Sequence, residues 1–393
     1  MRPRLVLWML LSLVVAGAAH AEEMSLAQAE QALLTAEGLP AKGREESGLR
    51  YHVGYDLVGA FRAAASRDPA RAYTGLGRCQ ALLGDYEQAA SSFRKALETD
   101  PGYGVAKGWL LEAYGLAQVA QATLSQLPKG SRVIRIEPLP GDRLLPRSEL
   151  RWVMLSAKQI TTGEGPPYFD VAFDNARLSV VLQKGNGPPQ IQQSVELNDT
   201  WFSNTANALQ LYVLDEMPPK VIAEAVMIGA SWSPAHIDAF AWREGKLIKL
   251  LALTSDEPMW IQDLKGDGCH EIGDFHAVGD EMSHAEQPRW TNVYAYQDGR
   301  YQIANGDFPQ EFTALTSEIR ETLGRYPGDY ELLKYLGVCY EIAGDRTAAL
   351  DAYREAESRL VARGLPELEG GAWGAPDTWE MADIRSRIRR LGQ

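Results

Sequence analysis

The chain has 393 residues, of which 45% are apolar and 23% charged, with 36 glycines, 21 prolines and 3 cysteines. This composition is typical of a globular protein and excludes a collagen, a coiled coil and a scaffold held by many disulfides. A formal net charge of −13 argues against a nucleic acid partner, because its phosphates would be repelled. The length is enough for two or three hydrophobic cores.

Residues 1–21 have the pattern of a signal peptide. An apolar run follows two arginines, and Ala19-His20-Ala21 fits the small-x-small rule for cleavage. Because the run of about 12 residues is shorter than the roughly 20 that span a bilayer, we expect cleavage before Glu22 rather than an uncleaved membrane anchor. No later stretch of the sequence approaches a membrane-spanning length. We therefore expect a periplasmic or secreted product without a stable membrane span.

Residues 22–130 show helical periodicity with capping signals, and one stretch of them predicts two antiparallel helices. Gly77 and Ala89 are small where these helices must approach closely, and Gly84-Asp85 makes the turn between them. The full pattern consists of Leu76, Gly77, Gly84, Asp85, Tyr86, Ala89, Phe93, Ala96 and Pro101. It resembles the tetratricopeptide repeat, which implies stacked helical hairpins whose concave face binds another protein or a peptide.

A second copy of the pattern is expected within residues 309–363. Its matching residues are Leu336, Gly337, Cys339, Gly344, Asp345, Ala349, Tyr353 and Ala356. Such hairpins stack because one alone cannot bury its apolar face, so we expect either one joined solenoid or two separate arms. Cys79 and Cys339 occupy the same repeat position. An oxidising compartment would allow a disulfide between them, and two buried small side chains are the simpler interpretation.

Residues 364–393 are expected to form a linker and a capping helix. Met381, Ile384, Ile388 and Leu391 make an apolar stripe at helical spacing, and arginines crowd the last turns, where the helix dipole favours cations. This stripe can cover the end of the helical stack. A basic amphipathic helix that contacts a membrane or an acidic partner is the alternative.

In the intervening region, residues 131–308, the sequence changes to the period of two that is typical of strands, with proline and glycine between the runs. Two segments match each other as strand, acid-Gly turn and strand, with their turns at Glu244-Gly245 and Asp298-Gly299. This match predicts two hairpins. Aromatic side chains on these strands are expected in a core or on a sheet face, and a carbohydrate-binding surface is the alternative.

The β-rich region contains an acidic loop at residues 256–286, where nine acids accompany a single base, Lys265. Oxygen ligands at alternate positions of a glycine-containing loop suit a hard cation. The candidate ligands are Asp263, Asp267, the backbone carbonyl of Cys269 and Glu271. The loop resembles the calcium loop of FG-GAP or VCBS-type β-propeller repeats, which implies a calcium site, although Lys265 stands at a ligand position. A hydrated turn in which Asp263 accepts backbone hydrogen bonds is the alternative.

The sequence contains no Walker loop, nucleophile elbow or paired zinc motif. We therefore predict an exported, non-enzymatic scaffold that binds a protein or peptide. The expected fold is α+β and multidomain, with tetratricopeptide-like helical hairpins at both ends of a β-rich central domain that is either partly propeller-like or a sandwich. The alternative function is that of a hydrolase acting on envelope polysaccharide, or of a carbohydrate-binding protein. The partner and the oligomeric state do not follow from the sequence.

Overall fold

The computed structural model describes residues 25–37, 49–139, 149–161, 171–197, 207–216, 218–227, 234–257, 259–279, 282–283, 286–363 and 376–393. The predicted signal peptide and the predicted linker up to residue 375 lie outside the described residues. The chain divides into two units, Met1–His270 and Glu271–Gln393. The strands expected within residues 131–308 are therefore shared between both units.

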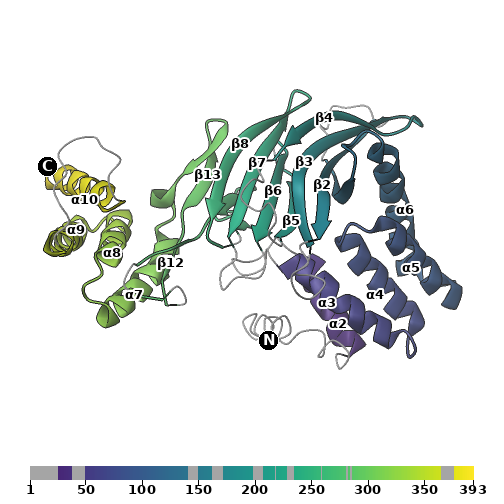
Figure 1. Ribbon diagram of the computed structural model, residues 1–393, viewed down its shortest axis with the longest axis horizontal. Helices are drawn as coiled ribbons and strands as arrows, with labels where there is room; N and C mark the ends of the chain where they lie inside the picture. Colours follow the sequence, from purple (N-terminus) through teal and green to yellow (C-terminus); the bar gives the residue numbers. More distant parts are fainter. Residues whose placement is uncertain are drawn as a thin grey trace. The chain divides into compact units, whose positions relative to one another are not determined.

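The helices of the first unit follow one another as neighbours, each packed against the next (Figure 1). Asp68 caps α4 by accepting the N–H of Arg71, and Asp85 caps α5 by accepting that of Gln88. Such caps satisfy N–H groups that have no partner inside the helix. The helices are α2 (Leu26–Glu37), α3 (Leu49–Ala64), α4 (Pro69–Leu82), α5 (Tyr86–Thr99) and α6 (Gly104–Leu124).

The α4–α5 hairpin has the close approach that the sequence predicts. A Cβ atom on Gly77 would lie 2.6 Å from the ring of Phe93, so a side chain there would force the two helices apart. Ala89 and Phe93 are fully buried in the contact. The turn between the helices has Gly84 at a φ of +76°, a conformation that glycine adopts without strain. The predicted helical hairpin is confirmed.

Two antiparallel sheets follow in the first unit, each a run of strands that pair in chain order. Buried side chains of both sheets, such as Leu155 and Val180 in one and Val221 and Phe240 in the other, form a single hydrophobic core. The first sheet contains β1 (Ser131–Pro138), β2 (Glu149–Thr161), β3 (Val171–Lys184) and β4 (Gln190–Glu196), and the second contains β5 (Asn207–Leu214), β6 (Lys220–Met227), β7 (Ala235–Arg243) and β8 (Lys246–Ser255). A short strand, β9 (Trp260–Gln262), comes later in the unit.

The turn of the α4–α5 hairpin is docked onto β1. A Cβ atom on Gly84 would lie 2.0 Å from the carbonyl oxygen of Ile134. The hydroxyl of Tyr86 accepts the N–H of Ile136 at 2.8 Å, and a guanidinium nitrogen of Arg135 donates to the carbonyl of Ala81 at 3.1 Å. The pairing of β1 with β2 is irregular between Val133 and Arg135. Backbone and side chain together therefore join the helices to the first sheet.

The second unit contains short strands followed by helices. Tyr294 of β13 pairs with Ile272 of β10 and with Ile303 of β14. Asp298 and Gly299, which both have positive φ angles, form the turn between β13 and β14, as Glu244 and Gly245 do between β7 and β8. Both predicted acid-Gly hairpins are thus present. The elements are β10 (Glu271–Gly273), β11 (His276–Ala277), β12 (Arg289–Trp290), β13 (Val293–Gln297), β14 (Arg300–Ile303), the 3-10 helix η2 (Asn305–Asp307), α7 (Pro309–Arg325), α8 (Tyr330–Ile342), α9 (Arg346–Ala362) and α10 (Pro376–Gly392).

The α8–α9 hairpin repeats the packing of α4–α5. A Cβ atom on Gly337 would lie 2.6 Å from the ring of Tyr353, the same distance as a Cβ atom on Gly77 from the ring of Phe93. Ile384 of α10 is fully buried in the same cluster as Leu360 of α9, so α10 covers this hairpin with its apolar stripe. Cys79 and Cys339 are buried thiols in equivalent helices, and burial raises the pKa of Cys339 to about 11. Among the helices that the structure describes, none is long and apolar enough to cross a membrane.

The docking of the first hairpin can be measured by comparing two equivalent glycines. Gly344 has a φ of +78° and nothing within 4 Å of an added Cβ atom, whereas Gly84 has nearly the same φ and meets Ile134. We expect Gly344→Ala to cost about 1–2 kcal/mol from the backbone conformation alone. Gly84→Ala should cost about 1–3 kcal/mol more, because the methyl group must push the strand away.

Urea unfolding followed by far-UV circular dichroism on the two variants and the parent measures both costs. The variants should have similar denaturant slopes. Equal losses of stability in the two variants would show that the turn is not held against β1.

Candidate functional site

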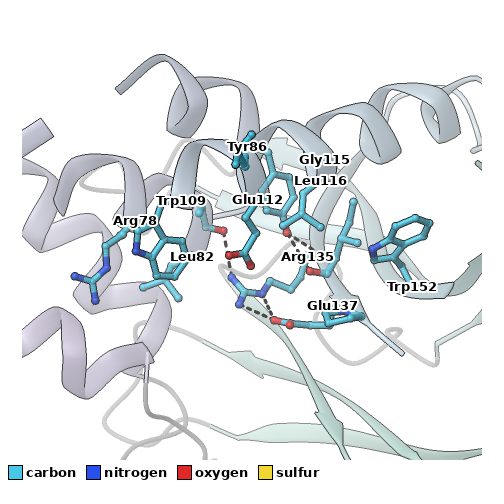
Figure 2. A pocket seen from close by; sticks show the side chains of 14 residues that line it. Arg78, Leu82, Tyr86, Trp109, Glu112, Gly115, Leu116, Arg135, Glu137 and Trp152 are labelled. Carbon is cyan, nitrogen blue, oxygen red and sulfur yellow. Dashed lines mark hydrogen bonds and ion pairs between the residues drawn. The ribbon is translucent and has the colours of Figure 1, made fainter. Parts of the chain in front are cut away.

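A cleft of about 380 Å³ opens in the first unit where α4 and α6 approach β1 (Figure 2). α4 contributes Arg78 and Leu82 to its lining, and α6 contributes Trp109, Leu111 and Glu112. The strands β1 and β2 supply the floor and the opposite wall, with Arg135 and Glu137 from β1 and Trp152 from β2. The cleft therefore combines side chains of the helical hairpins with side chains of the first sheet.

Local periodicity explains why these side chains share one cavity. Trp109, Glu112 and Leu116 are three and four residues apart in α6, so they lie on one face of the helix. Arg135 and Glu137 are two residues apart in β1, which places both on the same face of the strand. Each element thus presents one face to the cleft.

An ion pair on β1 forms the floor of the cleft. The Nε atom of Arg135 donates to Oε1 of Glu137 at 2.6 Å, and another nitrogen of the same guanidinium binds the carbonyl of Ala81. Burial alone would lower the pKa of Arg135, but the charge and hydrogen bond of Glu137, together with Tyr86 and Glu112, outweigh this effect and the pKa is raised. Burial is also the main reason that the pKa of the neighbouring Tyr86 is raised. Arg135 is therefore a fixed cation.

Aromatic and aliphatic side chains form the upper wall. The ring of Trp109 stacks on Phe93 with 6.3 Å between centroids and 17° between planes. The guanidinium of Arg78 lies 5.6 Å from the centroid of the Trp109 ring, within the range of a cation–π contact. Leu111, two residues after Trp109 in α6, is 70% exposed. An apolar side chain that projects this far beside an open cleft is available to pack against a ligand.

The lining of the cleft combines apolar and aromatic side chains with two arginines and two glutamates. Mostly apolar walls with a small number of polar groups are typical of ligand sites.

The predicted calcium loop around Asp263 is a hydrogen-bonded turn in the structure. Oδ1 of Asp263 accepts the N–H groups of Gly266 and Asp267 at 2.6 and 3.1 Å, and Oδ2 accepts that of Gly268 at 2.9 Å. These donors, that of Gly268 first, lower the pKa of the Asp263 carboxyl. Oδ1 of Asp267 accepts the N–H of Cys269 at 2.8 Å. Both aspartates therefore direct oxygens toward backbone donors, as the interpretation without metal expects.

The fourth predicted ligand, Glu271, begins β10 and is only 3% exposed. Within the described residues, no group of three or more His, Cys, Asp or Glu side chains could hold a metal ion. The loop in this arrangement does not present a set of free carboxylates, and calcium binding by Asp263, Asp267, Cys269 and Glu271 stays a prediction.

The second sheet contains buried polar groups that the sequence analysis did not identify. Glu224, 1% exposed, accepts the hydroxyl of Tyr212 at 3.0 Å and the N–H of Met259 at 2.9 Å. Loss of solvation on burial raises the pKa of Glu224 to about 7. Nearby in the chain, the fully buried Lys220 pairs with Glu216. The sequence signal was available, since β6 places two charges in an otherwise apolar strand.

Histidines pair with acids at three further places. Glu216 accepts the N–H of His270 at 2.8 Å, which ties the acidic loop to the start of β6. In β7, the buried Asp238 contacts Lys249 at 2.6 Å, and its neighbour His236 is 3.5 Å away. In the second unit, Asp274 accepts the hydroxyl of Tyr294, and its other contacts are with Asn292 and with His276. Opposite charges thus accompany these buried carboxylates, although neither oxygen of Asp238 has a hydrogen-bond partner among the described residues.

Comparison with known families identifies the helical hairpins. Tetratricopeptide repeat family models match residues 70–103 and 294–362. The first match covers α4 and α5, and the second begins in the β13–β14 hairpin and continues through α9. The matches support a tetratricopeptide-repeat protein, and such repeats mediate binding between proteins. No curated protein and no solved structure matches the chain significantly.

The buried carboxyl of Glu224 predicts a pH-dependent stability. Its pKa in the folded protein is about 7, above the ordinary value, so the unfolded chain releases this proton first as the pH rises. The contribution of Glu224 is therefore fully present in acid and is lost as the pH rises toward 7. Glu224→Gln keeps an acceptor for Met259 and a donor for Tyr212 without the charge.

When the pH rises from 5 to 8, the free energy of unfolding of the parent should fall by about 2 kcal/mol relative to that of Glu224→Gln. Denaturant unfolding at both pH values measures this gain. Glu244→Gln, at the exposed turn of the same sheet, serves as the control and should show no such change. If the free energies of unfolding of Glu224→Gln and the parent differ by the same amount at pH 5 and at pH 8, Glu224 is ionised at both pH values.

Calcium binding by the acidic loop predicts a rise in melting temperature. Calcium at 100 times its dissociation constant should add about 2.7 kcal/mol to the free energy of unfolding. Asp267→Asn keeps an oxygen for the N–H of Cys269 and removes one charge, so it should abolish the rise without opening the turn. The melting temperatures of the parent and of Asp267→Asn are measured by calorimetry without added metal, with calcium, and with magnesium as the control cation. An unchanged melting temperature of the parent would end the calcium hypothesis.

Proposed function

We propose that the protein is a non-enzymatic scaffold that binds an extended segment of a partner protein in the cleft between α4, α6 and β1. The observation that carries this proposal is the open cleft itself, with the exposed Leu111 at its edge and Trp109 and Trp152 among its walls. A cavity of about 380 Å³ is within the range that holds a small ligand or a few side chains of a peptide.

The repeat matches support the same function. The cleft is lined by α4 and by α6, and the repeat model that matches residues 70–103 covers the first of these helices together with α5. The helical hairpin thus supplies one wall of a recognition groove. The other wall is a strand of the chain itself, which limits the groove to a narrow segment rather than a folded domain.

The alternative of a polysaccharide hydrolase requires two carboxyl groups that face each other across a pocket. The cleft has two acids, but Arg135 binds the carboxylate of Glu137, and Glu112 belongs to an exposed part of α6. No observation favours hydrolysis over binding.

We infer two finer properties of this scaffold from supporting observations. Residues 1–21 support export to a periplasm or to the cell exterior, since they have the composition of a signal peptide. The single core shared by the sheets β1–β4 and β5–β8 supports a two-layer sandwich rather than propeller blades.

The binding site is tested by reversing the apolar character of one exposed side chain. Leu111→Asp should leave the fold intact, because Leu111 is 70% exposed, and should weaken binding in the cleft at least tenfold, about 1.4 kcal/mol. A phage-displayed library of random dodecapeptides is selected on the parent chain. The affinities of the selected peptides for the parent and the variant are then measured by fluorescence anisotropy.

Val105→Asp is the matched control. Val105 is 52% exposed on the same helix but does not line the cleft, so this variant should bind the selected peptides like the parent. Peptides that bind Leu111→Asp as tightly as the parent, or a selection that enriches none, would refute the proposed site.

A further inference from the structure

Four charged side chains line the cleft, the two arginines Arg78 and Arg135 and the two glutamates Glu112 and Glu137. Its floor holds the carboxylate of Glu137 and the guanidinium of Arg135, which pair with each other. Glu112 of α6 adds a second carboxylate, which is directed from the helix toward Arg135 (Figure 2). Two carboxylates thus lie around Arg135, and Arg78 is the second cation of the lining. Burial lowers the pKa of Arg135, and the nearby charges of Glu137 and, less strongly, Glu112 raise it.

The other cation of the lining, Arg78, is committed elsewhere. Its guanidinium lies over the ring of Trp109, and Figure 2 shows it on the far side of that ring from Arg135. Among the described residues, no hydrogen bond or ion pair within 4.0 Å joins the carboxylate of Glu112 to a basic side chain. Glu112 therefore lines the cleft near Arg135 without forming an ion pair or a hydrogen bond with it.

The surroundings of Glu112 are apolar. Trp109 and Leu116 lie on the same face of α6 as Glu112, and Leu111 projects beside them. Because Glu112 is exposed, its attraction for a cation acts through water and is weakened by salt. The formal net charge of the chain, −13, also favours the approach of a positively charged partner.

From these observations we propose that the partner segment carries a lysine or arginine beside an apolar residue. The cationic end group binds Glu112, and the apolar side chain packs against Leu111 and the tryptophan walls. This inference rests on the proposed function, since it assigns the chemistry of the segment that the cleft binds. Glu112 is the residue that selects for positive charge, whereas Arg135 and Glu137 form a neutral pair that positions the floor.

The test uses a short synthetic peptide of alternating leucine and lysine, with both ends blocked, and two counterparts in which glutamine or glutamate replaces lysine. Binding to the whole parent chain is measured by isothermal titration calorimetry at low and at high salt. The lysine peptide should bind about tenfold more tightly than the glutamine peptide, and the glutamate peptide should bind most weakly. The advantage of lysine should shrink at high salt.

Two variants assign the effect to Glu112. Glu112→Gln should reduce the affinity for the lysine peptide to that for the glutamine peptide and leave the glutamine peptide unaffected. Glu98→Gln, which removes an exposed acid of α5 outside the cleft, should change none of the affinities by more than about twofold.

The outcomes separate this inference from the proposed function. Equal binding of the lysine and glutamine peptides, or no binding of the lysine peptide, would overturn the preference for a basic segment. In either case the library selection with Leu111→Asp still decides whether the cleft binds peptides. If the lysine peptide binds but Leu111→Asp and Glu112→Gln both bind it like the parent, the site lies elsewhere and both proposals fail.

Discussion

The first unit depends on the contact between a helical turn and the edge of a sheet. Gly84 allows this contact because it has no Cβ atom, so its backbone can approach the carbonyl of Ile134 directly. Tyr86 and Arg135 add hydrogen bonds on either side of the contact. These interactions hold the α4–α5 hairpin at β1. The cleft lies between α4, α6 and this strand, so the docked turn helps to set the distance between its sides.

The elements that follow from the sequence are those whose determinants are close in the chain. Gly77 and Phe93 meet within one hairpin, and the pattern of small and aromatic residues predicts that meeting. The acid-Gly turns at Gly245 and Gly299 have a positive φ at two adjacent residues. The dipeptide of an acid and a glycine is enough to predict such a turn. The docking of Tyr86 on Ile136 joins residues 50 positions apart, and no local pattern indicates which strand receives the turn.

The candidate site is less predictable for the same reason. Arg78, Glu112 and Arg135 become neighbours only after α4, α6 and β1 have packed together. The burial of Glu224 depends on which face of the second sheet is covered, and the period of two leaves that choice open. At Asp263 the spacing of acids and glycines suits a cation and also an acid-capped turn. The structure shows the turn's hydrogen bonds, so the same local pattern serves two kinds of chemistry.

The floor of the cleft is a strand whose backbone is already held by β2, apart from the irregularity between Val133 and Arg135, and by Tyr86. Its side chains Arg135 and Glu137 are fixed by each other and by Ala81 before any ligand arrives. A segment that binds there has no disordered loop to organise, and most of the entropy lost on association is its own. Such preorganisation favours partners that are themselves stiff or extended, because a flexible segment would lose more freedom for the same contacts.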